Sequence, residues 1–169
     1  MKKNFSSSLI LSVVFMFCFS GCGYKLGSMT VGGIKTIAIL PIENQTGKSF
    51  IEESIVTNTI IQQFNKDGTI KVISSDIAEA FATIKLIEYT QNAQAYTAQD
   101  VGSHFRVILK ADIQVKSAKT KEILFAQQIE GEATYASDLD QSEIERIAVK
   151  EAIRDLSIDI VRELIEGGW

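Results

Sequence analysis

The segment His104–Tyr135, with the sequence HFRVILKADIQVKSAKTKEILFAQQIEGEATY, decides the fold. In its first half apolar and polar residues alternate, and only Ile108 breaks the rule. After a polar turn at 117–121 the alternation resumes. Alternate residues share one face of a strand, so this period indicates an antiparallel hairpin in a sheet covered on one face. The covered face carries Phe105, Val107, Leu109, Ala111, Ile113 and Val115 on the first arm, and Ile123, Phe125, Gln127, Ile129, Gly131, Ala133 and Tyr135 on the second.

The predicted hairpin is long, and a helix follows it. Each arm has about a dozen residues, which at about 3.3 Å per residue is roughly 40 Å, or twice an ordinary strand. Asp140 with Glu143, or Ser142 with Glu145, supplies a capping box for a helix start. The helix predicted from there has apolar residues on one side and charged residues opposite them. We expect this amphipathic helix to cover the sheet and to end at the two glycines 167–168.

Weaker patterns precede the hairpin. We expect a strand at 34–42. A helix follows, which begins at a capping box of Ser49 and Glu52 and runs to about residue 65. The remaining expected elements are a short strand at 69–74, extended chain at 83–90 and a long loop at 90–103. The whole pattern predicts an α+β fold in one domain, 34–169. Its expected form is a two-layer sandwich, with two helices packed on one face of a mostly antiparallel four-stranded sheet with a long hairpin.

A secretory signal peptide is predicted at 1–21. A short basic flank precedes an apolar run at 5–19, which is too short for a comfortable membrane span. Ser20-Gly21-Cys22 resembles a bacterial lipobox, in which the cysteine receives a diacylglyceryl group, the chain is cut before it and the new amino terminus is acylated. The resemblance implies lipidation of Cys22 and a lipidated tether at 22–33. A plain signal cut elsewhere and an uncleaved anchor remain as alternatives.

Charge and cysteine content narrow the class of partner. The 169 residues carry a formal net charge of −4, and loss of the two lysines in 1–21 makes it −6. Such an acidic domain is not expected to bind nucleic acid. Cys22 becomes the only cysteine of the mature chain, so we expect no disulfide. In many Gram-negative bacteria, an Asp directly after the lipidated cysteine retains a lipoprotein in the inner membrane. This chain has Gly23 at that position, so the resemblance to bacterial lipoproteins favours the outer membrane.

The sequence contains no arrangement of residues typical of an enzyme. His104 is the only histidine and stands on the polar side of the predicted strand, where a solvated side chain is the ordinary interpretation. There is no Gly-x-Ser-x-Gly turn, no phosphate-binding glycine loop and no second mature cysteine or histidine for a zinc site. We predict a binding protein that is not an enzyme and has no cofactor or metal.

Several short motifs, taken in order, resemble the LptE family of lipopolysaccharide-assembly lipoproteins. They are Gly21-Cys22-Gly23-Tyr24, then Ile37-Ala38-Ile39-Leu40-Pro41 with Asn44-x-Thr46, the long hairpin, Ala133-Thr134-Tyr135 and the final helix. The resemblance covers essentially the whole mature chain. It implies a lipid-anchored protein on the periplasmic face of the outer membrane. Such a protein plugs the barrel of an LptD-like partner, assists the assembly of that barrel and takes part in lipopolysaccharide transport to the outer leaflet.

Lipopolysaccharide carries phosphates, and Lys and Arg are the side chains that bind phosphate. The turn of the hairpin offers Lys116, Lys119 and Lys121, with Lys110 and Arg106 farther along the polar face. From charge alone, these five are the predicted lipopolysaccharide-binding residues and the only basic cluster expected in the acidic domain. The alternative interpretation is that lysines at a turn keep it solvated and protect the sheet from edge pairing.

Two other functions compete with lipopolysaccharide assembly. Lipoproteins that regulate peptidoglycan synthases, and secretion lipoproteins similar to CsgG, also begin with a strand like 37–42 followed by Asn-x-Thr. A regulator of a cell-wall enzyme would need a longer tether than the short stretch between Cys22 and the first strand. A periplasmic enzyme would need reactive side chains that this chain lacks. We therefore favour an outer-membrane partner.

Overall fold

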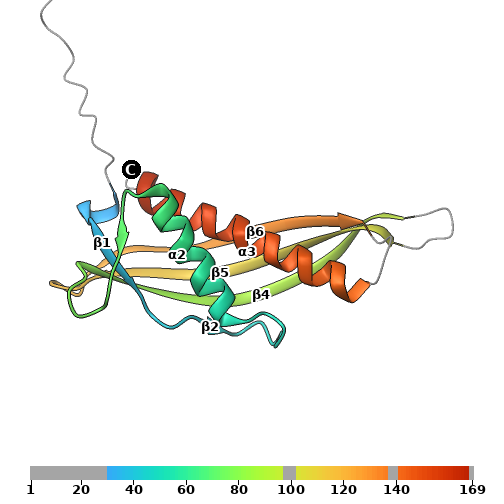
Figure 1. Ribbon diagram of the computed structural model, residues 1–169, viewed down its shortest axis with the longest axis horizontal. Helices are drawn as coiled ribbons and strands as arrows, with labels where there is room; N and C mark the ends of the chain where they lie inside the picture. The colour runs from blue at the N-terminus through green and yellow to red at the C-terminus, as the bar shows by residue number, and fades with distance from the viewer. Residues whose placement is uncertain (1–29, 97–101, 137–140, 168–169) are drawn as a thin grey trace, which may run out of the picture.

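The computed structural model describes residues 30–96, 102–136 and 141–167. The elements are η1 (Val31–Gly33), β1 (Thr36–Ile39), β2 (Glu43–Asn44), α2 (Glu53–Asp67), β3 (Lys71–Val72), β4 (Ala80–Tyr96), β5 (Gly102–Ser117), β6 (Ile123–Ala136) and α3 (Gln141–Glu166). Figure 1 shows an elongated body in which β4, β5 and β6 follow the long axis and both helices lie on the same side of the sheet. Within the described ranges, no helix is both long and apolar enough to cross a membrane.

The sheet is mixed and has six strands. β4, β5 and β6 form an antiparallel ladder in which Ile84 is opposite Ile113 and Ala111 is opposite Ile129. β1 and β2 pair in parallel with β4, and β3 pairs in parallel with β1. The α+β class and the long hairpin are confirmed. The prediction of four mostly antiparallel strands is wrong, and the curled sheet departs from a flat two-layer sandwich (Figure 1).

The prediction of a long loop at 90–103 is also wrong, because most of this segment is strand. β4 runs to residue 96 and β5 starts at residue 102. Gln91 pairs with Val107, and Ala93 pairs with Phe105. Gln, Asn and Ala have low strand propensity, but pairing with a neighbouring strand overrides propensity. The first hairpin of the ladder is therefore β4–β5.

The expected strand 34–42 is shortened to β1, and β2 follows just beyond its predicted end on the same edge of β4. The Leu40 amide donates to the Ala82 carbonyl at 2.9 Å, and the Gln45 amide donates to the Leu86 carbonyl at 2.8 Å. Pro41 lies between these bonds and has no amide to donate. Sheet pairing therefore continues on both sides of an interruption at the proline.

Helix α2 begins at Glu53, later than the capping box at Ser49 predicts. Its N-cap, Glu52, makes no side-chain cap hydrogen bond. The Asn44 side-chain amide donates to the carbonyls of Lys48 and Ile51, at 2.9 Å each, and holds the preceding segment as a loop. A contact with β2 therefore sets the start of the helix. At the other end, Gly68 adopts the left-handed conformation and its amide bonds the Phe64 carbonyl at 2.9 Å, which closes the helix.

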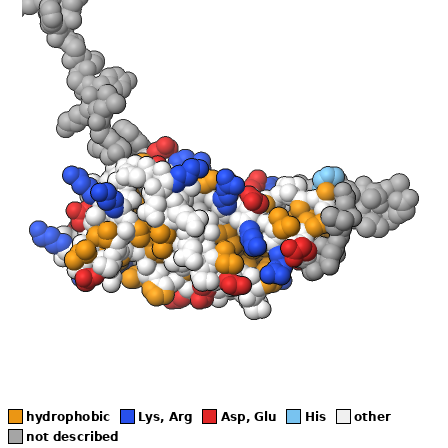
Figure 2. Space-filling model, in the orientation of Figure 1, with side chains coloured by type: hydrophobic (Ala, Val, Ile, Leu, Met, Phe, Trp, Pro, Cys, Tyr) orange, Lys and Arg blue, Asp and Glu red, His pale blue; other side chains and the backbone are white. Residues whose placement is uncertain are grey.

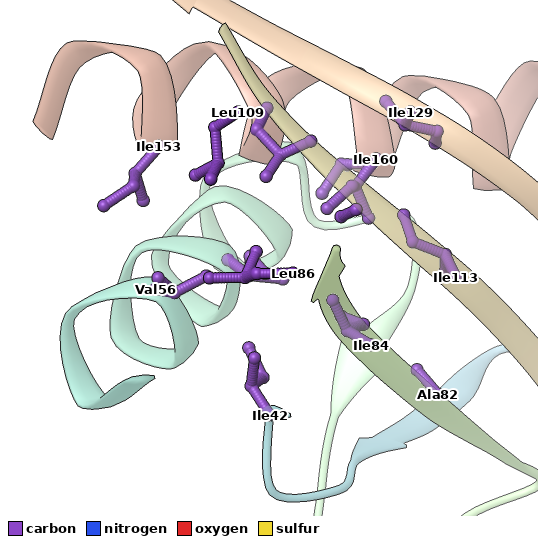
Figure 3. Packing of buried hydrophobic residues seen from close by; sticks show 14 of the residues in the cluster. Ile42, Val56, Ala82, Ile84, Leu86, Leu109, Ile113, Ile129, Ile153 and Ile160 are labelled. Atoms are coloured by element: carbon purple, nitrogen blue, oxygen red, sulfur yellow. The ribbon is translucent and has the colours of Figure 1, made fainter. Parts of the chain in front are cut away.

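The core lies between the two helices and the inner face of the sheet. Val56 of α2 and Ile153 and Ile160 of α3 are buried together with Leu86 and Leu109 of the sheet. Figure 3 shows these side chains converging from the helices and the strands. Burial of one such side chain stabilises the fold by about 1.5–3 kcal/mol. The predicted one-faced hairpin and its covering helix are thus confirmed, except that Ile123 and Gln127, predicted on the covered face, are exposed.

Gly131 sets the distance between β6 and α3. A Cβ atom built on Gly131 would lie 2.3 Å from the Ala152 carbonyl oxygen and 2.4 Å from the Leu156 amide nitrogen. Both are backbone atoms of a buried helix, which cannot move aside as a flexible side chain can. Next to this contact, the Glu132 amide donates to the Asp155 carboxylate at 3.0 Å. A residue without a side chain is therefore required at this crossing.

Gly131→Ala is expected to lower the free energy of unfolding by about 1–3 kcal/mol, because the new methyl group overlaps the backbone of α3. Urea denaturation of the mature domain measures the change. Gln128→Ala, an exposed position on the opposite face of the same strand, should change the value by less than about 0.5 kcal/mol. Equal stability of wild type and Gly131→Ala would contradict the close approach.

Glu79 connects β1 to the start of β4, and it should make the free energy of unfolding depend on pH in the acid range. Its carboxylate accepts hydrogen bonds from the amides of Lys35 at 2.6 Å and Thr36 at 3.2 Å, and these bonds lower the pKa of Glu79 below 4.5. A lowered native pKa contributes stability that is present above the ordinary pKa and is lost as the pH falls through the native pKa. The wild type should therefore lose more stability than Glu79→Gln between about pH 5 and pH 3.

Urea denaturation at a series of pH values compares the two proteins. Glu122→Gln is the matched control, because Glu122 is also exposed and lies on the β5–β6 turn, whose Ala118 amide bonds the Glu79 carbonyl. Its stability curve should run parallel to that of the wild type. Parallel curves for all three proteins would remove Glu79 as a source of the acid dependence.

Candidate functional site

The turn between β5 and β6 presents Lys116, Lys119 and Lys121, all exposed. The Ser117 amide donates to the Glu122 carbonyl at 2.9 Å, and the Lys121 amide donates to the Ser117 carbonyl at 3.0 Å. Lys121 has a positive φ of 64°, which non-glycine residues adopt mainly in turns. The turn is therefore internally hydrogen-bonded, and it holds three cations on a defined backbone. We call these three residues the lysine turn.

The lysine turn is open to a phosphate ligand. Within the described ranges, no ion pair involves any of its three lysines. The Lys121 ammonium lies 5.4 Å from the centroid of the Phe81 ring, a cation–π contact that leaves the other side of the ammonium to solvent. Three ammonium groups without carboxylate partners are suited to phosphate oxygens.

Arg106 and Lys110, the other two predicted residues, lie on the open face of the sheet and are already paired. The Lys110 Nζ atom lies 2.8 Å from Glu130 Oε1 and 3.6 Å from Glu88 Oε2. The hydrogen bond that Lys110 donates to Glu130 contributes most to raising the pKa of Lys110. Arg106 forms an ion pair with Glu132. The five predicted residues therefore divide into a free group at the turn and a neutralised group farther along β5.

A second basic cluster lies between the helices, so the expectation of only one is wrong. A groove of about 380 Å³ is lined by Lys66 of α2 and by Lys150 and Arg154 of α3, together with Thr59, Gln62 and Gln63. The Arg154 Nη1 atom also lies 3.8 Å from Glu151 Oε2. The only sequence signal was the four-residue spacing of Lys150 and Arg154, which places both on one face of a helix. Figure 2 shows Lys and Arg mixed with Asp and Glu over the helical side.

The lysine turn lies at the end of the body where the chain enters from the amino terminus. A groove of about 480 Å³ is lined by Gly32 and Gly33 of η1, by Glu79 before β4, and by Ala118 and Lys119 of the turn. Figure 1 shows η1, in blue, and the β5–β6 turn at the same end of the long axis. Thr30 and Val31 are buried, so the chain joins the packed body by residue 30. We call this end the tether end.

The part of the sheet away from the tether end carries clustered aromatic side chains, and the Lys48 ammonium lies 5.4 Å from the Tyr89 ring centroid. The Tyr89 hydroxyl donates to Glu145 of α3 at 2.5 Å, and the Tyr89 ring meets the ring of Phe50 edge-on at 5.7 Å. Burial, followed by the nearby Glu145 carboxylate, raises the pKa of Tyr89. Tyr135 stacks on Phe105 at 5.4 Å. These contacts join the start of α3 to the sheet and have a structural role.

The remaining predicted positions contribute no reactive site. His104 is exposed and lies opposite Ala136 in the ladder. Across 30–96, 102–136 and 141–167, no group of three or more His, Cys, Asp or Glu side chains is arranged to hold a metal ion. Cys22 lies outside the described residues.

Solved structures share the fold. The hypothetical protein CT253 from Chlamydia trachomatis matches with a TM-score of 0.56 and 8% identity, over 78% of this chain and 98% of that one. A minor lipoprotein from Acinetobacter baumannii matches with a TM-score of 0.53 and 14% identity, over 79% and 92%. Lipoprotein B from Nitrosomonas europaea matches with a TM-score of 0.51 and 16% identity, over 86% and 89%. At these identities the likeness shows the fold alone.

Sequence comparison gives the family. No curated protein matches the chain. The family model of LptE, described as lipopolysaccharide-assembly, matches residues 34–164. This match runs from before β1 into the last turn of α3 and includes the lysine turn. The chain therefore belongs to the LptE family.

Proposed function

We propose that this protein is an outer-membrane lipoprotein that plugs an LptD-like barrel, assists its assembly and takes part in lipopolysaccharide transport. The family match over 34–164 is the observation that carries the proposal. In this proposal, residues 1–21 are removed, Cys22 is acylated and the tether that follows leads into a single domain on the periplasmic face. The family works in assembly, so we propose no enzymatic reaction.

The open face of the sheet supports a place inside a barrel. It carries ion pairs between strands: Lys85 with Glu43 at 3.2 Å, Lys110 with Glu130, and Arg106 with Glu132. Within the described part of the chain, both helices lie on the other face (Figure 1). The interior of a transmembrane barrel is polar, whereas its outer surface is apolar. A polar sheet face is compatible with a polar barrel wall, and the long narrow body suits a lumen.

Contact with lipopolysaccharide is assigned to the basic residues of β5 and its turn. Lys116, Lys119 and Lys121 meet the phosphates first, because they have no carboxylate partners to release. Arg106 and Lys110 can bind phosphate only if it displaces their carboxylate partners, Glu132, Glu130 and Glu88. These two residues therefore contribute less to lipopolysaccharide binding. This order follows from the cost of leaving a carboxylate without its partner.

Purification of the tagged full-length protein from detergent-solubilised envelopes tests the proposed role. We expect a large outer-membrane barrel to copurify, and mass spectrometry to find acyl chains on Cys22 at the mature amino terminus. In cells without the barrel partner, Cys22→Ser should have lost the stable membrane attachment of the wild type, because two or more acyl chains provide it. Recovery of a peptidoglycan synthase without a barrel would overturn the proposal in favour of a cell-wall regulator. An unacylated mature product would overturn the anchor.

The double variant Lys119→Glu/Lys121→Glu is expected to weaken lipopolysaccharide binding at least about tenfold, because it replaces two phosphate-binding cations by carboxylates. Its circular dichroism and denaturation should match those of the wild type, since both side chains are exposed. Lys66→Glu/Lys150→Glu is the control. It changes the net charge by the same amount on the helical side and should bind normally. Unchanged affinity of the turn variant at matched salt would remove the lysine turn from the site.

A further inference from the structure

Two large aliphatic side chains are mostly exposed to solvent. Ile77 is 68% exposed and Ile123 is 56% exposed, and within the described ranges the other large exposed hydrophobic residues are Ile147 at 52% and Phe50 at 41%. Phe50 packs on Tyr89, as described above. Ile77 and Ile123 are therefore the most exposed large apolar side chains of the described body, and no feature of the fold accounts for their exposure.

Both isoleucines belong to segments that flank the lysine turn. Ile77 lies in the turn just before β4, where the Ala118 amide donates to the Glu79 carbonyl at 2.8 Å and Ala80 pairs with Ser117. Ile123 begins β6 and pairs with Lys116. The order across this end of the sheet is thus the segment of Ile77, the lysine turn and the segment of Ile123. Two apolar side chains flank Lys119 and Lys121 at the tether end.

The position of the anchor selects the same end. The eight residue-to-residue steps from Cys22 to Thr30 span at most about 28 Å when fully extended. β4 has 17 residues, so the long strands extend for roughly 55 Å. An acyl group on Cys22 therefore keeps the tether end near the membrane surface, whereas the start of α3 lies toward the other end (Figure 1).

We infer that the tether end is a membrane-contact surface, in which Ile77 and Ile123 enter the headgroup region and Lys119 and Lys121 lie against lipid phosphates. This inference rests on the proposed acylation of Cys22. Aliphatic side chains beside lysines are the composition that interfacial membrane surfaces use, since the apolar part enters the acyl boundary and the ammonium stays at the phosphates. Basic side chains close to a membrane are also attracted by its anionic lipids.

The nearby carboxylates leave this arrangement intact. Glu79 is engaged by the amides of Lys35 and Thr36, which satisfy its charge within the fold. Glu122 in the turn and Asp76 beside Ile77 are outnumbered by Lys116, Lys119 and Lys121. The tether end therefore has local positive charge on an otherwise acidic domain.

Tryptophan probes test the contact in the acylated full-length protein. Trp169 is the only tryptophan, so Trp169→Phe provides a silent background. Ile77→Trp, Ile123→Trp and the control Ile147→Trp are then reconstituted, without any barrel or lipopolysaccharide, into vesicles of phosphatidylethanolamine and phosphatidylglycerol with brominated acyl chains. All three sites are exposed, so a larger side chain fits. We expect a blue shift and loss of most of the fluorescence at 77 and 123, and no change at 147.

The lysines are tested in the same system. Adding Lys119→Glu/Lys121→Glu to the Ile123→Trp protein should reduce the quenching in vesicles that contain phosphatidylglycerol. Quenching at neither 77 nor 123, or equal quenching at 147, would overturn the inference. It would also be overturned if the probes were unquenched in vesicles but shielded from iodide in the purified barrel complex, because the surface would then be a protein contact.

Mass spectrometry of the same preparations separates this inference from the proposed function. Acylated protein with unquenched probes contradicts the membrane-contact surface alone and leaves the anchor in place. Protein without acyl chains at Cys22 contradicts the proposed anchor and, with it, the inference that rests on it.

Discussion

The seating of α3 on β5 and β6 is the contact on which the rest of the structure depends. Gly131 lets the β6 backbone approach the helix at Ala152 and Leu156, closer than any side chain would permit. The 26-residue helix then covers the inner face of the ladder along its length and buries Leu109 and Ile113. Because both helices pack on the inner face of the sheet, the other face stays open to solvent and carries the ion pairs. The difference between the two faces thus originates in how closely one helix packs.

This asymmetry separates stability from binding. Apolar burial between the helices and the sheet supplies the main favourable term of folding, so the open face and the ends are free to carry polar and charged groups. The open face uses ion pairs between exposed or half-exposed side chains, which contribute little to stability individually. Such pairs suit a surface that meets a polar wall. The lysine turn begins at the last pairs of the ladder, and among the residues that the structure describes no carboxylate forms an ion pair with its lysines.

The sequence predicted the parts of the fold that depend on local periodicity. Alternation predicted β5 and β6, and the apolar stripe predicted α3. The full length of β4 and the parallel pairing of β1, β2 and β3 could not be predicted, because they depend on strand neighbours far apart in the chain. The lysine turn was predicted because its residues are contiguous. The pairing of Lys110 with Glu130 needed the hairpin register, and the groove of Lys66, Lys150 and Arg154 needed the packing of two helices.

The tether restricts where the basic residues act. A lysine turn at the far end of the body would stand about 55 Å from the anchor, well clear of the lipid headgroups. At the tether end it instead lies beside η1, and the chain from Thr30 to the acylated cysteine spans at most about 28 Å, so the turn can reach the lipid phosphates. Lipopolysaccharide that arrives from the periplasm presents phosphates of the same chemistry to this end of the body. Lipopolysaccharide binding by the lysine turn and membrane contact by Ile77 and Ile123 therefore require one orientation of the body, with the strands pointing away from the anchor.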